Sequence, residues 1–297
     1  MIDFSCDHVT NVGGVKCIQY RRELIDQLAT SNNATMDESN SSNEFYFTSD
    51  EPNQSVCWLP QLVGSQKMSS AWHLQFLVPR DYTVYASGKR QDHSLEEQTA
   101  LYEYEIGEAE RSIPDKIGFV ICPTPVTTPF EVFGKKEQGT ACFMTRQKQA
   151  NFNPKLASDM IESICSLMGP GQRHFPTRET KVVFLPNLFP AKFPKQSYNF
   201  AGGLHILDQE LLFRPNQIDK RHHLYKHLSS SLAYAFFGGK VREAEYADSW
   251  LLVAIRERIG DRFTKSKCGA LMYRYTAMKR IEKLYELMKE GVEVHPL

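Results

Sequence analysis

The stretch that decides the fold reads Leu232-Ala233-Tyr234-Ala235-Phe236-Phe237-Gly238-Gly239, followed closely by Asp248-Ser249-Trp250-Leu251-Leu252-Val253. Leading into it, apolar side chains repeat every four residues, at Leu224, Leu228, Leu232 and Phe236. This spacing places them on one stripe of a helix, and the two glycines are a typical helix stop. We therefore predict a helix over about 219–237, with two further helical patterns over 247–259 and 270–289.

The rest of the chain divides into a strand-rich first half and a mixed second half. In the second half, helical spacing predicts a helix over Pro154–Met168, and apolar runs predict strands over 181–186 and 204–213. The first half predicts short strands, separated by turn residues, over 15–20, 45–48, 71–78, 83–86, 101–106, 117–122 and 130–133. Residues 30–44 are rich in Ser and Asn and predict a disordered insertion. We place a domain boundary at residue 134, between an all-β antiparallel sandwich or saddle (1–134) and an α+β domain (135–297).

Composition narrows the classes of function. The 297 residues include 35 basic and 35 acidic ones, so the formal net charge is zero. A polybasic nucleic-acid tail and an acidic activator are both excluded, and any contact with nucleic acid must come from local patches. The start has no recognisable secretory signal, and no apolar run approaches the roughly 20 residues of a membrane helix. Seven widely spaced cysteines without a C-x-x-C pair indicate reduced, buried thiols.

One histidine pair could bind a metal. His223 and His227 stand four residues apart on the predicted helix, and Glu245 is available downstream as a third zinc ligand. Metal-assisted hydrolysis also needs a carboxylate directly after the first histidine, and that position is Leu224. A solvated helix face and a metal site therefore both remain open. A serine nucleophile is the other route to hydrolysis, but the serine run Ser229–Ser231 has no flanking nucleophile-elbow motif.

The two segments quoted at the outset resemble the active-site helices of the gluzincin zinc aminopeptidases, which read H-E-L-A-H-Q-W-F-G-N and W-L-N-E-G. Anchored on Phe237-Gly238, the resemblance puts Ser230 and Tyr234 at the two zinc-histidine positions and Ser231 at the general-base glutamate. Val253 falls at the third zinc ligand. The resemblance implies a β sandwich followed by a thermolysin-like α+β domain, both truncated. It also implies a protein without catalytic zinc, without a cofactor and without peptidase activity.

The motif that binds the substrate amine in that family, G-A-M-E-N, also lacks its functional side chain in this sequence. Aligned on Gly203-Leu204, its glutamate falls at Phe200, which offers no carboxylate to an ammonium group. Upstream, the family's aromatic-proline strand end and the strand after it are matched by Cys57–Pro60 and Ala71–Pro79, and its closing strand by Ile113–Val120.

Among relatives without zinc ligands, the chain resembles the TFIID subunit 2 family. The matching segments are Trp58–Pro60, Ser70–Phe76, Pro129–Val132, Leu232–Gly238, Ala247–Leu252 and Val292–Leu297. The resemblance implies a nuclear, non-catalytic scaffold that binds other TFIID subunits, the TATA-binding protein and initiator DNA in RNA polymerase II transcription. Basic stretches at 214–227 and 256–280 are candidates for phosphate contacts, or simply solvated helix faces. The alternatives are a hydrolase with a shifted zinc site and an inactive aminopeptidase paralogue that binds peptides.

Overall fold

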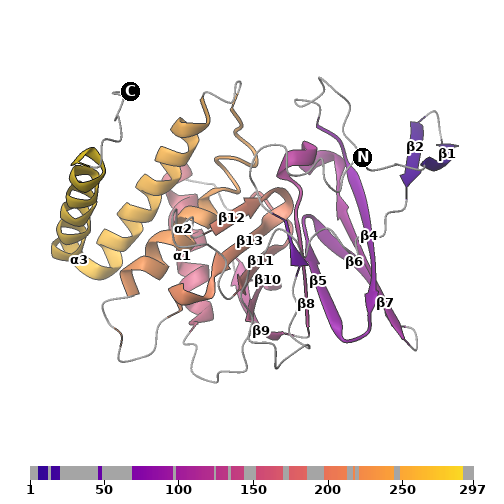
Figure 1. Ribbon diagram of the computed structural model, residues 1–297, viewed down its shortest axis with the longest axis horizontal. Helices are drawn as coiled ribbons and strands as arrows, with labels where there is room; N and C mark the ends of the chain where they lie inside the picture. The colour runs from indigo at the N-terminus through magenta and orange to yellow at the C-terminus, as the bar shows by residue number, and fades with distance from the viewer. Residues whose placement is uncertain are drawn as a thin grey trace.

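The computed structural model describes most of the chain between residues 69 and 289 and a few segments before it. The described residues are 6–12, 15–20, 46–48, 69–95, 98–123, 125–132, 135–143, 152–169, 174–185, 197–212, 217, 221–243 and 248–289. Figure 1 shows them as a row of sheets with helices at one end. A separate antiparallel hairpin, β1 (Cys6–Val12) with β2 (Val15–Tyr20), lies at the other end.

Two antiparallel three-stranded sheets form a sandwich. One has the order β4 (Trp72–Pro79), β7 (Thr99–Ile106), β6 (Lys89–Leu95), and the other β3 (Tyr46–Phe47), β8 (Phe119–Pro123), β5 (Tyr82–Ala86). Alternate apolar residues of both sheets meet in one core, formed by Leu74, Val78, Val84, Ala86, Ala100, Tyr102, Tyr104, Ile106, Ile117 and Phe119. The Tyr104 hydroxyl crosses this core and donates to the Val84 carbonyl at 2.7 Å.

A mixed five-stranded sheet follows the sandwich. Its order is β12 (Ser197–Phe200), β13 (Leu204–Asp208), β11 (Thr180–Leu185), β10 (Lys135–Phe143), β9 (Val126–Val132). The three inner strands are parallel to one another, and the two edge strands run antiparallel to them.

Both faces of the mixed sheet are covered, which is why all six residues of β11 are buried. On one face, Val183 and Leu185 pack with Tyr85 and Val120 of the sandwich. On the other face, Val182 and Phe184 pack against the helices.

Two helices, α1 (Pro154–Met168) and α2 (Arg221–Ala233), cover the face of the mixed sheet that is turned away from the sandwich, and α3 (Ser249–Lys289) packs against α2 on their outer side (Figure 1). Helix α1 has the predicted bounds, because the Asn153 side chain caps it by accepting from the Lys155 amide and Pro154 fits the first turn. In α2, Leu224, Leu228 and Leu232 are fully buried, as their four-residue spacing predicted.

Two helix predictions need correction. Helix α2 ends at Ala233 rather than 237, because Tyr234–Phe236 form a turn that leads to Gly238 at φ 136°. The two patterns at 247–259 and 270–289 belong to one run, α3, with a kink at Gly269. Gly260 does not stop this helix. A Cβ there would lie 2.6 Å from the Lys226 carbonyl oxygen, so glycine allows α3 to approach α2.

Several strands also differ from the prediction. The sequence did not predict β1, β6, β10 or β12, and β13 ends at Asp208 instead of 213. Residues 130–132, predicted as a strand of the first domain, belong to β9. This strand pairs with β10 of the second domain and is therefore an edge strand of the mixed sheet. The boundary at 134 stays a prediction, and the insertion at 30–44 lies outside the described residues. No helix in the described part of the chain is long and apolar enough to cross a membrane.

Candidate functional site

The candidate site lies where the end of α2 meets α3 and the edge strand β12. Ser230 and Ser231 are on the last turn of α2, and Tyr234 is in the turn that follows. Because the leucine stripe faces the mixed sheet, neighbouring positions on α2 face α3. Ser231 is buried, and its hydroxyl has no hydrogen-bond partner among the described residues.

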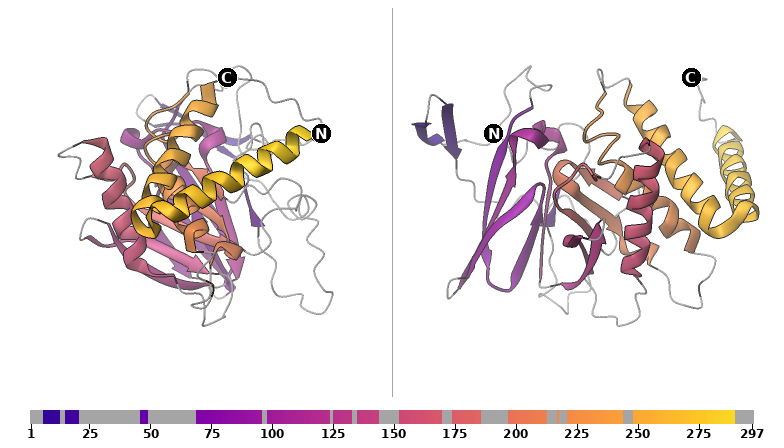
Figure 2. Two further views of the ribbon diagram at one scale, coloured as in Figure 1. Left: turned by 90° about the vertical axis from the view of Figure 1, so that its left-hand side faces the viewer. Right: turned by 180° about the vertical axis from the view of Figure 1, so that it is seen from behind.

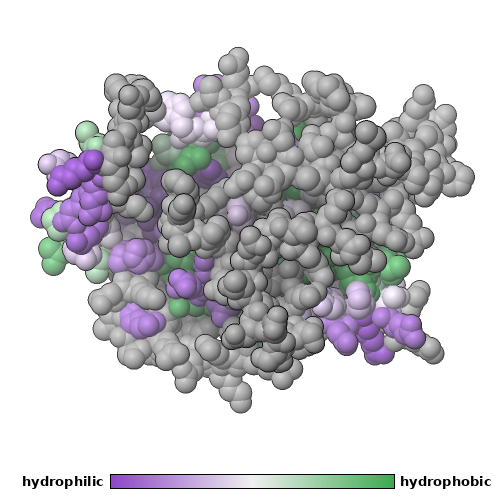
Figure 3. All heavy atoms as spheres, viewed as in Figure 1, coloured by the Kyte–Doolittle hydropathy of each residue, from purple (hydrophilic) through white to green (hydrophobic). Residues whose placement is uncertain are grey.

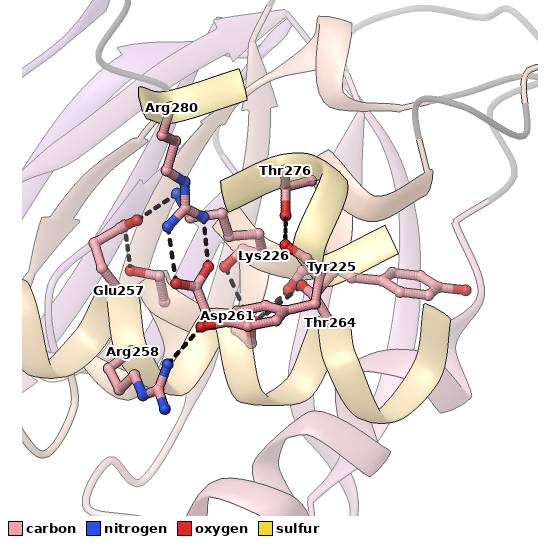
Figure 4. A network of polar contacts seen from close by, with 12 residues as sticks. Tyr225, Lys226, Glu257, Arg258, Asp261, Thr264, Thr276 and Arg280 are labelled. Carbon is pink, nitrogen blue, oxygen red and sulfur yellow. Dashed lines mark hydrogen bonds and ion pairs between the residues drawn. The ribbon is translucent and has the colours of Figure 1, made fainter. Parts of the chain in front are cut away.

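Ser230 belongs to a polar network between α2 and α3. Its hydroxyl donates to Glu257 Oε1 at 3.0 Å, and Lys226 Nζ lies 2.6 Å from Glu257 Oε2. Burial acts to raise the pKa of Glu257, but the charge and hydrogen bond of Lys226, together with His227 and the Ser230 hydroxyl, outweigh burial and hold the pKa below its usual range. Figure 4 shows Lys226 of α2 and Glu257 of α3 together with labelled residues from both halves of α3. The residue that the resemblance aligns with the first zinc-histidine is therefore a serine whose hydroxyl is bonded to a carboxylate that already pairs with lysine.

Tyr234 and Phe200 line one cleft of about 300 Å³. The cleft lies between the sandwich, which contributes Glu108, Glu110 and Arg111, and the turn after α2, which contributes Lys240 and Arg242. The Arg256 guanidinium carbon stands 5.1 Å from the centre of the Tyr234 ring, a cation–π contact. The structure thus brings together two of the positions named from the sequence, although 34 residues separate them in the chain.

Val253, at the third ligand position, does not line this cleft. Its side chain is 45% exposed, one turn before Arg256 and Glu257 on α3. Arg256 and Glu257 contact the candidate-site residues Tyr234 and Ser230, and the sequence did not assign them to the site. Their spacing from Val253, three and four residues, puts them on the same helix face and is the signal that identifies them.

The residues at these positions do not fit a zinc ion. Zn²⁺ in proteins takes thiolate, imidazole and carboxylate ligands, whereas the positions hold two serine hydroxyls, a phenol and a valine. The guanidinium beside Tyr234 is a cation where a metal would need an anion or a neutral donor. We therefore derive no chemistry through zinc at this site.

The histidine pair lies elsewhere on α2. The His223 and His227 rings are nearly parallel, with centroids 6.5 Å apart. Burial, together with the Lys226 charge, lowers the pKa of His227 to about 4, so the imidazole is neutral at pH 7. Glu245 lies outside the described residues. Within the residues that are described, no group of three or more His, Cys, Asp or Glu side chains is arranged to hold a metal ion.

The basic stretches are only partly available for phosphates. Arg256 turns toward Tyr234, Arg280 pairs with Asp261, and Lys267 lies 2.9 Å from Asp159. The exposed basic side chains on α3 include Arg258, Arg262, Lys265 and Arg274. Most of 214–220 lies outside the described residues. The thiols of Cys122, Cys142 and Cys165 are buried and unpaired, and burial raises the pKa of Cys142 to about 12.

The fold is that of zinc aminopeptidases. The M1 zinc metallopeptidase of Deinococcus radiodurans matches with a TM-score of 0.61 and 14% identity over 85% of this chain and 52% of that one. Its E323A mutant bound to a Tyr-Ser-Ala substrate matches with a TM-score of 0.60 and 15% identity over 82% and 51%. The chain spans about half the length of these structures. No family model and no curated sequence matches it. The predicted fold class, a sandwich followed by an aminopeptidase-like α+β domain, is confirmed.

Proposed function

We propose that this chain is a non-catalytic, aminopeptidase-like subunit of the general transcription factor TFIID. In this role it scaffolds the complex in the nucleus and contributes to binding of initiator DNA during RNA polymerase II initiation. The fold supports the aminopeptidase-like part of the proposal. The transcription assignment rests on the sequence resemblance to the TFIID subunit 2 family.

The observation that carries the non-catalytic part is the chemistry at the peptidase positions. Ser230 is bonded into the Lys226–Glu257 pair, and Tyr234 packs against Arg256. A peptidase of this fold needs a metal to polarise the scissile carbonyl and a base to activate water. Here a hydroxyl, a phenol and an apolar side chain hold the ligand positions, and Phe200 replaces the carboxylate that would bind a substrate amine.

The test of the assembly role is purification of the tagged full chain from nuclear extract. We expect the TATA-binding protein and other TFIID subunits to co-purify in near-stoichiometric amounts. The matched control is the same chain with Gly139→Trp, because a Cβ at residue 139 already lies 2.1 Å from the Phe130 ring and a large side chain there disrupts the core. Absence of both TFIID subunits and the TATA-binding protein from the wild-type sample contradicts the transcription assignment and leaves the fold intact.

DNA binding is tested separately on α3. Arg262 and Lys265 are exposed one turn apart, and their charges would reach backbone phosphates. We expect Arg262→Glu with Lys265→Glu to weaken binding of an initiator duplex about ten-fold and to reduce its salt dependence. Lys89→Glu with Lys155→Glu makes the same change in net charge at exposed positions elsewhere and serves as the control. Equal loss in both variants contradicts a phosphate contact at α3.

The cleft favours a second candidate, an inactive aminopeptidase paralogue that binds peptides. A cleft of about 300 Å³ persists beside Phe200 and Tyr234, and the E323A mutant of the Deinococcus enzyme binds Tyr-Ser-Ala. Isothermal titration with short peptides tests this reading. Binding that Lys240→Glu alters, at an exposed position of the cleft, would favour the second candidate if TFIID subunits are absent from the nuclear purification.

The shifted-zinc hydrolase remains the third reading, and metal analysis separates it from the other two. Purified chain is assayed for zinc content and for hydrolysis of an aminopeptide. Stoichiometric zinc together with turnover that His227→Ala abolishes would replace the scaffold proposal by an enzymatic one.

A further inference from the structure

The second half of α3, residues 270–289, forms a rigidly held arm at the edge of the molecule. The kink at Gly269, with φ 88° and ψ 166°, separates it from the first half. Arg280 on the arm makes two hydrogen bonds to Asp261 on the first half, at 2.8 and 2.5 Å, and Arg258 bonds to the Tyr273 hydroxyl at 2.8 Å. Figure 2 (left) shows the arm lying across the outer face, beyond the other helices.

The outward side of this arm is apolar. Large apolar side chains are exposed at Leu271, Tyr275, Met278, Ile281, Leu284, Tyr285 and Met288. Steps of three and four residues place them on one face of the helix. Leu271 is 82% exposed and Ile281 is 67% exposed. Hydrophobic and strongly hydrophilic side chains lie side by side at the left edge of Figure 3, where Figure 1 places α3. A contiguous exposed face of this kind marks an interaction site.

The charged side chains around the apolar face indicate what kind of molecule binds it. Residues 270–289 carry five basic side chains and two acidic ones, in a chain whose net charge is zero. Arg280 is neutralised by Asp261, and Lys279 pairs with Glu282 at 2.7 Å. The adjoining half of α3 adds exposed Arg262 and Lys265. A second copy of this chain would bring the same positive charges against these, so self-association is disfavoured.

The composition also argues against a lipid surface. Glu282 stands between Met278 and Tyr285 on the apolar face, where insertion into a membrane would carry a charged side chain toward the acyl chains. Tyr and Met, which contribute four of the seven exposed apolar side chains, are enriched at protein–protein interfaces.

We propose that the arm of α3 is a docking surface for an amphipathic helix of another protein, with an apolar stripe flanked by acidic residues. The stripe packs along Leu271, Met278, Ile281, Tyr285 and Met288, and acidic side chains beside it pair with Arg274, which is exposed on the same face of the arm. Held by Asp261 and Arg258 of the first half, the arm is already in place before the partner binds, which lowers the ordering cost of association. This surface lies outside the aminopeptidase-like cleft and does not depend on the identity of the complex.

The test measures fluorescence anisotropy of labelled synthetic helices of about three heptads with the full chain. Two probes share leucine at the a and d positions, and the outer positions are glutamate in one and lysine in the other. We expect the acidic probe to bind about ten-fold tighter than the basic one, and more weakly as salt rises. Arg274→Glu with Lys279→Glu is expected to reverse the preference.

Single substitutions localise the site. Ile281→Asp and Leu271→Asp, at opposite ends of the arm, are expected to weaken the acidic probe at least about ten-fold. Leu77→Asp, at a 59% exposed position on β4, is the matched control and should leave binding unchanged. Circular dichroism checks that each variant keeps the helix content of the wild type.

Four outcomes overturn the proposal: equal binding of the two probes, no binding of either, an Ile281-dependent dimer in sedimentation equilibrium, or Ile281-dependent binding to phosphatidylserine vesicles. Because none of these readouts involves TFIID, failure here leaves the proposed function untouched, and failure of the nuclear purification leaves the docking surface untouched.

Discussion

The buried side chain of Lys181 links the mixed sheet to the sandwich by hydrogen bonds. It lies in β11 with its side chain buried, and Nζ donates to the Ala86 carbonyl at 3.0 Å and to the Gly88 carbonyl. Glu179 Oε2 lies 3.4 Å away. Burial lowers the pKa of Lys181 while Glu179 opposes this shift. A buried ammonium is tolerated only when its protons have acceptors, and two of the acceptors here belong to the sandwich.

Lys181→Met should therefore destabilise the protein although methionine suits a buried strand. The substitution leaves the buried Ala86 and Gly88 carbonyls without the Lys181 donor, and it removes the cation beside Glu179, which keeps the Arg90 amide as a donor. We expect a loss of about 2–4 kcal/mol in the free energy of unfolding, measured by urea denaturation. Lys89→Met, at an exposed position close by, should change it by less than about 0.5 kcal/mol. Equal effects would show that the network contributes nothing.

His205 gives the protein a defined sensitivity to acid. It faces the helices from β13, its Nδ1 lies 3.0 Å from Asn199 Oδ1, and burial with a contribution from Arg256 lowers its pKa to about 3. The unfolded chain takes up a proton near pH 6.5, so it binds more protons than the folded chain between those values.

Stability should consequently fall as pH drops from about 6.5 toward about 3, by up to about 1.4 kcal/mol per pH unit from this group. His227, with a pKa of about 4, adds to the slope in the same direction. Urea denaturation at several pH values checks this, and His205→Asn should give a shallower slope than the wild type. An unchanged slope would mean that His205 is protonated in the folded state.

At the scale of elements, α3 is shaped by one residue. Gly269 adopts φ 88° and ψ 166°, a conformation restricted almost entirely to glycine, and a Cβ there would meet nothing within 4 Å. Backbone conformation alone therefore fixes the residue type. The kink returns the arm toward the first half, so that Arg280 reaches Asp261.

Gly269→Ala should favour a straighter helix and separate this pair. We expect a cost of about 1–3 kcal/mol in the free energy of unfolding from backbone strain or from its relief by straightening. A double-mutant cycle with Arg280→Gln distinguishes the two. If the helix straightens, Arg280→Gln costs about 1–3 kcal/mol in the wild type and close to nothing in Gly269→Ala. Additive effects would show that the arm keeps its position without glycine.

For the whole molecule, the decisive feature is the close contact between the sandwich and the mixed sheet. Phe200 packs against Gly118, where a Cβ would lie 2.5 Å from the ring. Gly202, with φ 66°, accepts a hydrogen bond from the Gly88 amide at 3.2 Å. At Gly118 and Gly202 the sandwich and the mixed sheet come so close that neither position has space for a Cβ atom. The cleft opens beside this contact.

Gly202→Ala is expected to force the sheets apart. Its Cβ would lie 2.1 Å from the Gly88 nitrogen, a clash with backbone that no side-chain rotation relieves. We expect a loss of about 2–4 kcal/mol and faster proteolysis between sandwich and mixed sheet. Gly169→Ala is the control, because φ is also positive, at 134°, while the space around it is open. Similar losses in both would assign the effect to backbone strain rather than to the interface.

Local patterns in the sequence predicted α1, the approximate positions of α2 and α3, and most sandwich strands. Leu224, Leu228 and Leu232 are buried as their spacing required, and Asn153-Pro154 starts α1 where the capping signal stands. These features depend on neighbours within a turn or two of chain. Only the tertiary structure decided that Glu257 bonds Ser230, that Phe200 and Tyr234 share a cleft, and that Gly260 continues a helix. Each depends on which segments approach one another in space, because hydrogen bonds and steric contacts act over a few ångströms regardless of distance along the chain.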